Sequence, residues 1–374
     1  MEILVLSCGT GGGHHAAAAA IEEELLCRGH SVTMLNPYDL LGGKLAARVD
    51  NAYISLAQRA PGGFGAIYAL GRVYRKLPWR SPVYYVNAHM ADAMTAYLQE
   101  HPVDAVVMTH IFPGEIMTCL RDRGVAVPKT ILIATDYVCV PFTEECICDA
   151  YVIPSPELTG EYIGHGVPEE RIFPLGIPVR SSFRAAVTRE QAKAALGLAP
   201  DKRYILVSGG SIGAGRLEKA LHILRTVTKD TDIRLIIICG NNEALYRRLE
   251  KRCGPEVRLI RQTTQMALYL RACEMFFTKP GGLSTTETAV MGVPLALLPP
   301  IPGCENRNRA FYTQTGMGTA VTLSAKDMRR AVDLLRSPSD CERMLERQRA
   351  SIPKDAAQRI CDLISAEVAG QQLA

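Results

Sequence analysis

Three stretches of the chain join a buried-type strand, a glycine turn and a helix start, and they hold most of its candidate chemistry. One is Lys279-Pro280-Gly281-Gly282-Leu283-Ser284-Thr285-Thr286-Glu287, which follows the apolar run 274–278. Such a turn presents unpaired backbone N–H groups and the positive end of a helix dipole, so it suits a phosphate. Glu287, about one turn into the helix, is placed to accept both hydroxyls of a ribose. We therefore predict a nucleotide-binding corner made of Lys279, Gly281, Gly282, Ser284 and Glu287. The alternative is an ordinary turn in which Glu287 only complements the helix dipole.

The second stretch contains a histidine. Residues 2–7 are typical of a buried strand, and Cys8-Gly9-Thr10-Gly11-Gly12-Gly13-His14 leads from it into an alanine-rich helix. The glycines do not follow the GxGxxG pattern of dinucleotide-binding proteins, and no acidic residue ends the next strand. A histidine near a helix N-terminus loses affinity for its proton, so His14 is predicted to act as a base near pH 7. Gly13, beside it, is predicted to lie next to the bound nucleotide. The alternative is a histidine that caps or packs the turn.

The third stretch opens the second half of the chain. The strand 203–208 runs into Gly209-Gly210-Ser211-Ile212-Gly213-Ala214-Gly215 and then into a helix. It is the third unit of strand, glycine loop and helix, and it opens the second domain as residues 9–13 open the first. Further on, Glu305 and Asn308 are three apart at the start of a helix, so both could point from one face toward a polyhydroxylated ligand.

Two more polar pairs follow strand ends in the first half of the chain. Thr109-His110 comes after the strand 104–108, and Thr135-Asp136 comes after the strand 130–134. In parallel α/β sheets the ligand crevice lies outside the carboxyl ends of the strands. His110 and Asp136 are therefore expected to line the same ligand crevice as His14. Each of them taken alone is also typical of an ordinary loop.

The segment 51–91 contains no acidic residue and combines basic with aromatic side chains. Such a segment can bind anionic headgroups while it buries an apolar face in a membrane surface. The candidate membrane and acceptor residues are Arg72, Arg75, Lys76, Trp79 and Arg80, together with His110. The alternative is a solvated helix pair whose tyrosines face the core.

Composition limits the class of protein. The 374 residues are 48% hydrophobic and 21% charged, which is typical of a globular protein with material for two cores. A net charge of +4 does not indicate a nucleic-acid partner. The 12 cysteines form no disulfide framework and no zinc pattern, and no run of 18 apolar residues occurs. We expect no bound metal, no membrane span and a reducing cytoplasm.

Strands and helices alternate along the whole chain, which predicts two parallel α/β domains. The stiff stretch Leu175-Gly176-Ile177-Pro178-Val179 is expected to link them. The predicted division is a first domain over 1–178, a second domain over 179–340, and C-terminal helices over 341–374.

Four motifs in this order give the chain a resemblance to a known family. They are Gly11-Gly12-Gly13-His14, Gly209-Gly210-Ser211-Ile212-Gly213, Lys279-Pro280-Gly281-Gly282 with Glu287, and Pro302-Gly303-Cys304-Glu305 with Asn308. The sequence resembles the monogalactosyldiacylglycerol synthases and processive diacylglycerol glucosyltransferases over about residues 2–335. More distantly, it is similar to the lipid-intermediate N-acetylglucosaminyltransferase of peptidoglycan synthesis.

The resemblance implies a GT-B fold, with two Rossmann-like domains facing a central cleft, and an inverting transfer of a hexose from a UDP-sugar to diacylglycerol. It implies that His14 acts as base or organises the acceptor, that Asp136 lines the acceptor side, and that Glu287 binds the ribose. Gly210, Ser211, Gly281 and Gly282 would lie at the diphosphate, with Gly213 beside the same donor, and Glu305 with Asn308 would lie at the sugar. Residues 1–178 would bind the acceptor, residues 179–340 would bind the UDP-sugar, and the helices of 341–374 would pack back toward the first domain. The protein would attach peripherally to the anionic inner face of the cell membrane.

Two departures from the family pattern concern specificity. Cys304 stands where the family commonly has glutamine, which affects the donor sugar, and Val140 and Thr143 replace a His and a Trp of some members. No cofactor is expected, since helix N-termini can stabilise the departing UDP and no Asp-x-Asp motif is placed to hold a metal. His14 or Asp136 would take the proton of the acceptor.

Two other classes of protein remain open at this stage. A UDP-N-acetylglucosamine-dependent transferase or 2-epimerase shares the fold, although an epimerase has no use for the basic and aromatic segment. A non-catalytic module that binds nucleotide sugar or lipid is the third alternative, and the presence of both His14 and Glu287 argues against it.

Overall fold

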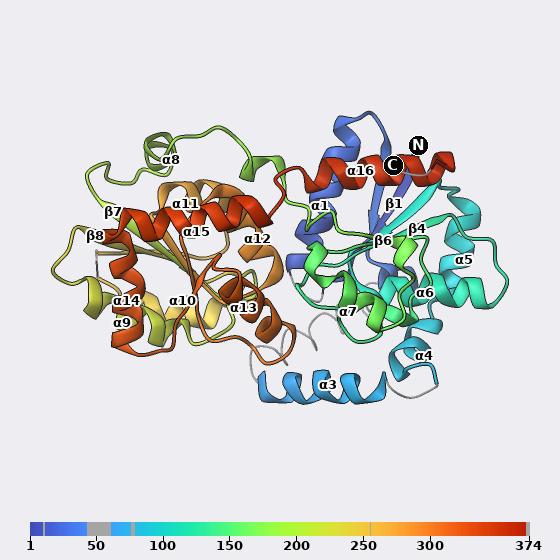
Figure 1. The fold of residues 1–374 in the computed structure, drawn as a ribbon, viewed down its shortest axis with the longest axis horizontal. Helices are drawn as coiled ribbons and strands as arrows, with labels where there is room; N and C mark the ends of the chain where they lie inside the picture. The colour runs from blue at the N-terminus through green and yellow to red at the C-terminus, as the bar shows by residue number, and fades with distance from the viewer. Residues whose placement is uncertain (10–11, 43–60, 76–78, 255, 372–374) are drawn as a thin grey trace. The chain divides into compact units, whose positions relative to one another are not determined.

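The computed structural model describes residues 1–9, 12–42, 61–75, 79–254 and 256–371, which fall into two compact units (Figure 1). As far as they are described, residues 1–42, 62–181 and 353–371 form the first unit, and 182–352 form the second. Each unit is built on a parallel sheet covered by helices, which confirms the predicted α/β class.

The described part of the first unit holds a six-stranded parallel sheet in the order β2-β1-β3-β4-β5-β6. Its strands are β1 (Glu2–Leu6), β2 (Ser31–Leu35), β3 (Ala105–Met108), β4 (Lys129–Ile133), β5 (Ala150–Val152) and β6 (Ile172–Phe173). Leu6, Met108 and Leu132 lie opposite one another in register. The loops that follow β1, β3 and β4 therefore leave the sheet at one edge.

Helices cover both faces of this sheet (Figure 1). On one face, α1 (Gly12–Cys27) and α16 (Ala356–Ala369) pack their alanine, isoleucine and leucine side chains on β1, β3, β4 and β5. The remaining α-helices that the structure describes in this unit are α3 (Pro61–Tyr74), α4 (Pro82–Ala88), α5 (Ala91–Glu100), α6 (Ile111–Asp122) and α7 (Thr159–Gly164). Because β1, β3 and β5 are buried on both faces, they are nearly continuous apolar runs rather than alternating ones, whereas the edge strand β2 is partly exposed.

The second unit repeats the plan within its described residues, with the strand order β12-β11-β10-β7-β8-β9. Its strands are β7 (Arg203–Ser208), β8 (Ile233–Ile238), β9 (Val257–Ile260), β10 (Met275–Thr278), β11 (Leu295–Leu297) and β12 (Thr319–Ala320). One face packs against α9 (Leu217–Thr228), α10 (Glu243–Glu250) and α14 (Ala325–Asp333). The other helices are α8 (Arg189–Ala195), α11 (Met266–Ala272), α12 (Gly282–Met291), α13 (Cys304–Gln314) and α15 (Pro338–Ser351).

The chain returns to the first unit later than the predicted residue 341. Helix α15 stays with the second unit, because the Gln348 amide donates to the carbonyls of Val293 and Met317 at 3.2 and 2.9 Å. Only α16, after Pro353, belongs to the first unit. There Arg28 of α1 forms an ion pair with Asp362 at 2.6 Å. The charged sequence of α15 gave no sign of these buried contacts.

Candidate functional site

His14 lies at the carboxyl edge of the first sheet, in the first turn of α1. Its Nδ1 is 2.7 Å from the carbonyl oxygen of Thr109 and 2.9 Å from Oγ1 of Thr135. A carbonyl oxygen only accepts, so Nδ1 of the neutral ring carries the proton and donates it. The lone pair is therefore on Nε2, which is the nitrogen able to act as a base.

His110 packs against His14 and caps the next helix. The two rings meet edge to face, with centroids 4.6 Å apart. The Nδ1 atom of His110 accepts from the backbone N–H of Phe112 at 3.2 Å, which caps the N-terminus of α6. His110 thus combines a structural role with a place beside the candidate base.

Burial lowers the pKa of both histidines. For His14 the loss of hydration is the largest cause, and the Asp136 carboxylate and the Thr109 carbonyl oppose it. Burial holds the pKa of His110 well below its usual value, and the neighbouring His14 lowers it further. Both rings are therefore neutral near pH 7, as the sequence predicted for His14.

Asp136 acts on His14 through its charge. It is half-buried just after β4, and its carboxylate raises the pKa of His14. The structure therefore gathers three of the predicted residues, His14, His110 and Asp136, at one edge of the first sheet. It adds Thr109 and Thr135, to which the sequence analysis assigned no role. The signal available for both threonines was their place directly after a strand end.

The glycine loop after β7 is shaped mainly by its own packing. A Cβ on Gly213 would lie 1.9 Å from the carbonyl oxygen of Cys239, and Asn242 donates to the Gly213 carbonyl at 3.0 Å. Gly213 is thus required by the turn, where the sequence suggested an approach of ligand. Gly210 has a positive φ of 73° and a Cβ there would lie 3.2 Å from Cε of Lys279, so it leaves room for the lysine. Ser211, between them, is exposed.

Lys279, at the end of β10, forms an ion pair with Glu305 of α13. The two side chains are only 15% and 12% exposed, and the second carboxylate oxygen of Glu305 accepts from the backbone N–H of Ile301 at 2.8 Å. Lys279 also lies close to Gly281, whose Cβ position is 3.4 Å from Nζ. The lysine head is therefore held beside both predicted phosphate-binding turns of this unit.

One stripe of α12 is open while the rest of the helix is buried. Gly281, Ser284 and Glu287, spaced by three residues, are half-buried, whereas Thr285, Thr286 and Thr288 are fully buried and bond back to helix carbonyls. The predicted donor residues Ser284 and Glu287 thus lie on the one face of α12 that a ligand can reach. Gly282, the first residue of the helix, is buried.

Asn308 and Glu305 do not form the open pair that the sequence suggested. Asn308 is fully buried and its amide donates to the carbonyl of Pro280 at 3.0 Å. Glu305 is occupied by Lys279 and Ile301. The face of α13 that carries them packs on the Pro-Gly-Gly turn, so they position that turn.

The basic side chains of the membrane candidate segment divide into two groups. Arg75 forms a bidentate ion pair with Glu144 at 2.8 and 2.6 Å, and Arg80 pairs with Asp122 at 2.9 Å. These two arginines therefore tie the segment to its own unit, and their place at a membrane surface stays a prediction. Arg72 and Trp79 are exposed, and Lys76 lies outside the described residues.

Large apolar side chains are exposed beside Arg72. Leu70, Val73 and Trp79 are each more than 60% exposed, and Tyr85 and Val86 of α4 are exposed as well. On its other face, α3 is held by Gly71, whose Cβ position lies 3.4 Å from Pro141. We call Leu70, Arg72, Val73, Trp79, Tyr85 and Val86 the α3–α4 surface.

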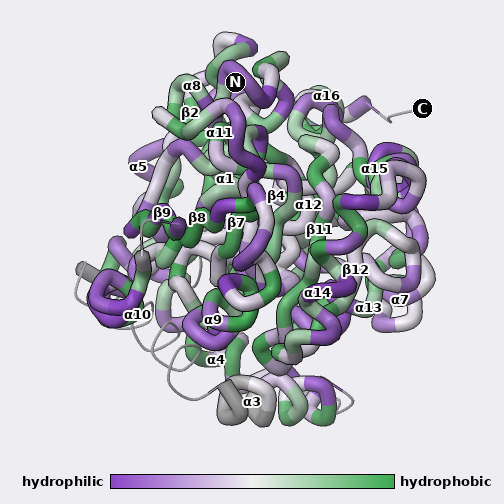
Figure 2. The backbone as a smooth tube through the Cα atoms, turned by 90° about the vertical axis from the view of Figure 1, so that its left-hand side faces the viewer, coloured by the Kyte–Doolittle hydropathy of each residue, from purple (hydrophilic) through white to green (hydrophobic). Residues whose placement is uncertain are grey.

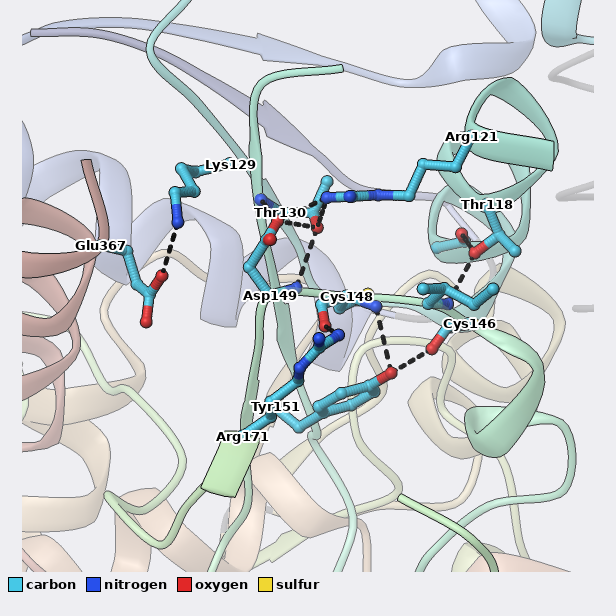
Figure 3. Close-up of polar contacts among 12 residues, drawn as sticks. Thr118, Arg121, Lys129, Thr130, Cys146, Cys148, Asp149, Tyr151, Arg171 and Glu367 are labelled. Atoms are coloured by element: carbon cyan, nitrogen blue, oxygen red, sulfur yellow. Dashed lines mark hydrogen bonds and ion pairs between the residues drawn. The ribbon is translucent and has the colours of Figure 1, made fainter. Parts of the chain in front are cut away.

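Figure 3 shows the contacts that fix the cysteine-containing segment behind α6. Asp149 pairs with Arg121 and accepts from the backbone N–H of Thr130 at 2.8 Å. The Tyr151 hydroxyl donates to the Cys146 carbonyl and accepts from the Cys148 N–H. Burial raises the pKa of Cys148 to about 12 and that of Cys146 well above its usual value, so both thiols keep their protons as core residues.

Two further findings concern metals and membranes. Within the ranges that the structure describes, no group of three or more His, Cys, Asp or Glu side chains could hold a metal ion. No helix in those same ranges is long and apolar enough to cross a bilayer.

Comparison with known sequences confirms the resemblance seen in the motifs. Residues 14–179 match the family described as monogalactosyldiacylglycerol (MGDG) synthase. A processive diacylglycerol beta-glucosyltransferase of Bacillus pumilus is 22% identical over 298 residues, which is 79% of this chain and 76% of that protein.

Solved structures show the same fold at low identity. MurG of Acinetobacter baumannii matches with a TM-score of 0.60 at 16% identity, over 97% of this chain and 99% of MurG. The UDP-GlcNAc 2-epimerase of Neisseria meningitidis matches with a TM-score of 0.62 at 12% identity, over 98% and 100%. The predicted GT-B fold, with two Rossmann-like domains, is therefore confirmed.

Proposed function

We propose that this chain, whose residues 14–179 match the MGDG synthase family, is an inverting glycosyltransferase that moves a hexose from a UDP-sugar to diacylglycerol. The family description and the relatives' names support the glycosyltransferase class. The acceptor lipid, the hexose, and attachment to the cytoplasmic face of an anionic membrane are the finer parts of the proposal. The product would be a beta-glycosyl-diacylglycerol.

The geometry of His14 carries this proposal. Its Nδ1–H is committed to the Thr109 carbonyl, so Nε2 can take the proton of an acceptor hydroxyl as that oxygen attacks the anomeric carbon. Attack from the face opposite UDP inverts the configuration. The imidazolium that forms is stabilised by the Asp136 carboxylate, whose charge favours the protonated ring. Asp136 thus supports His14, and His14 is the base.

The donor would bind at the Lys279 corner of the second unit. The open stripe of α12 offers Glu287 to the ribose and the helix N-terminus to the diphosphate. Lys279 lies against both glycine turns, where its charge would stabilise the departing UDP. This arrangement supports departure of UDP without a resident cofactor.

The α3–α4 surface would meet the membrane. Exposed leucine, valine, tyrosine and tryptophan side chains beside an arginine match the composition of interfacial helices. The ion pairs of Arg75 and Arg80 would hold this surface in place while Arg72 contacts anionic headgroups.

The test uses diacylglycerol in anionic vesicles with UDP-glucose, UDP-galactose or UDP-N-acetylglucosamine, and follows UDP release and glycolipid mass. His14→Ala should abolish a lipid-dependent transfer. His15→Ala is the matched control, because His15 is exposed on the same helix turn. Glycolipid formation by the His14 variant would refute the assigned base. Epimerised UDP-N-acetylglucosamine without lipid would indicate an epimerase, and UDP binding without turnover would indicate a binding module.

A further inference from the structure

A groove lies between α9 and α10 on the second unit. Its volume is about 490 Å³, which is within the range of sites for small molecules. Its lining residues come from two segments of the chain, 215–225 and 242–253. None of the predicted donor residues is among the lining residues.

The groove is strongly basic. Arg216, Lys219, Arg225, Arg248 and Arg252 line it together with one carboxylate, Glu218. These five cations and one anion give a formal charge of +4, with His222 neutral.

The ion pairs within the groove leave a surplus of positive charge. Arg248 of α10 and Arg252, in the turn that follows this helix, share the single carboxylate of Glu218. Arg225 pairs with Glu256, at 2.6 Å. Two guanidinium groups on one carboxylate retain donors and charge for a second anion.

The opposite wall and the floor add two further elements. Lys219 and His222, one turn apart on α9, are exposed along the groove. Beneath them lie the buried leucines Leu217, Leu221, Leu245 and Leu249. In Figure 2 much of α10 has the colour of hydrophilic residues. These leucines are at most 4% exposed, so they close the bottom of the groove and leave its cationic walls to contact an anion.

We propose that this groove binds the phosphoryl group of an organic phosphate, either a small soluble one or a phospholipid headgroup, at a site separate from the donor corner. The guanidinium groups of Arg248 and Arg252, together with Lys219 of α9, would hold the phosphoryl oxygens. The site goes beyond the proposed transfer, and its test does not depend on catalysis.

The experiment measures binding of pyrophosphate by calorimetry, and of phosphatidylglycerol and phosphatidylcholine vesicles by flotation, each without UDP and with saturating UDP. The double variant Lys219→Gln/Arg248→Gln keeps the Arg252–Glu218 pair, so it should fold. We expect it to lose at least about 10-fold in affinity, as removal of charge-assisted contacts predicts. The control Arg247→Gln removes an exposed arginine beside Arg248 that does not line the groove.

Each arm identifies one source of the phosphoryl group. Pyrophosphate binding that persists with UDP and is lost in the double variant indicates a soluble phosphate. Binding to phosphatidylglycerol vesicles alone, lost in the same variant, indicates a headgroup. The proposal is overturned if neither probe binds, if UDP displaces both, or if the double variant binds as the control does. Thermal melting of both variants verifies that they are folded.

Discussion

The two units place a functional side chain at the ends of their strands in opposite ways. In the first unit, His14 is fixed by an uncharged carbonyl and a hydroxyl, and burial keeps the ring neutral. In the second, Lys279 is fixed by the charge of Glu305. The difference matches two tasks, because a base must be neutral before it takes a proton, whereas a group that binds diphosphate must carry charge.

The hydrogen-bond partners of His14 and Lys279 explain why the imidazole stays neutral and the ammonium group stays charged. If a carboxylate bonded to His14 Nδ1 directly, it would raise the pKa of the ring, which Asp136 does only partly from its position after β4. Glu305, in contrast, is itself anchored by the N–H of Ile301, so Lys279 meets a fixed carboxylate. We expect the diphosphate to compete with Glu305 for this lysine.

The largest expected effect comes from replacing the base. His14→Asn keeps a side-chain donor for Thr109 but has no group to take the proton, so the transfer rate should fall by about 100- to 10,000-fold. The dissociation constant for UDP should stay unchanged, because UDP is proposed to bind the other unit. Steady-state rates and calorimetry measure the two quantities. Weaker UDP binding with normal turnover would reverse the assignment of tasks to the two units.

The next effect concerns binding in the second unit. Lys279→Gln should weaken UDP binding by about 10- to 100-fold, as loss of a charge-assisted hydrogen bond predicts, and should leave uridine binding unchanged. Glu305→Gln is the informative partner, since it removes the competing carboxylate and should leave UDP binding equal or tighter. If both variants weaken UDP equally, the ion pair only supports the fold of the turn.

These predictions depend on features that the sequence showed to different degrees. Strands and glycine turns are local, so their order predicted both sheets, the position of His14 and the Lys279 corner. The roles of Thr109 and Thr135 require β3 and β4 to be neighbours of β1, which is a property of the sheet order. A single sequence does not show which threonine carbonyl or hydroxyl meets a histidine 95 or 121 residues away.

Charged and polar side chains were the least predictable part. Arg75 and Arg72 are three residues apart in one basic segment, yet one is paired with Glu144 and the other is exposed. Asn308 looked like a sugar-binding residue because it is polar at a helix start, but it is buried on the Pro280 carbonyl. In each case the partner is remote in the sequence, so composition alone could not distinguish a structural contact from an open site.

The pH profile tests the neutral state of His14. The pKa of His14 lies below its usual value near 6.5. As pH is lowered, the transfer rate should therefore stay near its maximum through about pH 6.5. It should fall about tenfold per pH unit only once the pH is below the lowered pKa. An acid limb above pH 6.5 would contradict the burial of the ring. The transfer rate at saturating substrates, measured from about pH 4.5 to about pH 8, tests this profile, since histidine titrates in roughly that range.

Stability should change with pH in the same direction. Unfolded histidine binds a proton near pH 6.5, while His14 and His110 in the folded chain do so only at lower pH. The unfolded state then binds more protons, so the free energy of unfolding should decrease as pH falls below about 6.5. Denaturant melts at several pH values measure it, and His14→Asn should reduce the slope.

The smallest effect separates the two partners of His14. Thr135→Val removes the hydroxyl 2.9 Å from Nδ1 and leaves the Thr109 carbonyl in place, so the ring keeps its tautomer. Loss of one neutral hydrogen bond, about 0.5–1.5 kcal/mol, predicts a transfer rate only about 2- to 10-fold slower, with UDP binding unchanged. Thr95→Val is the control, since its hydroxyl bonds only within α5, to the Ala91 carbonyl. A loss as large as that of His14→Asn would mean that Thr135, rather than the Thr109 carbonyl, holds the ring in the orientation that the base requires.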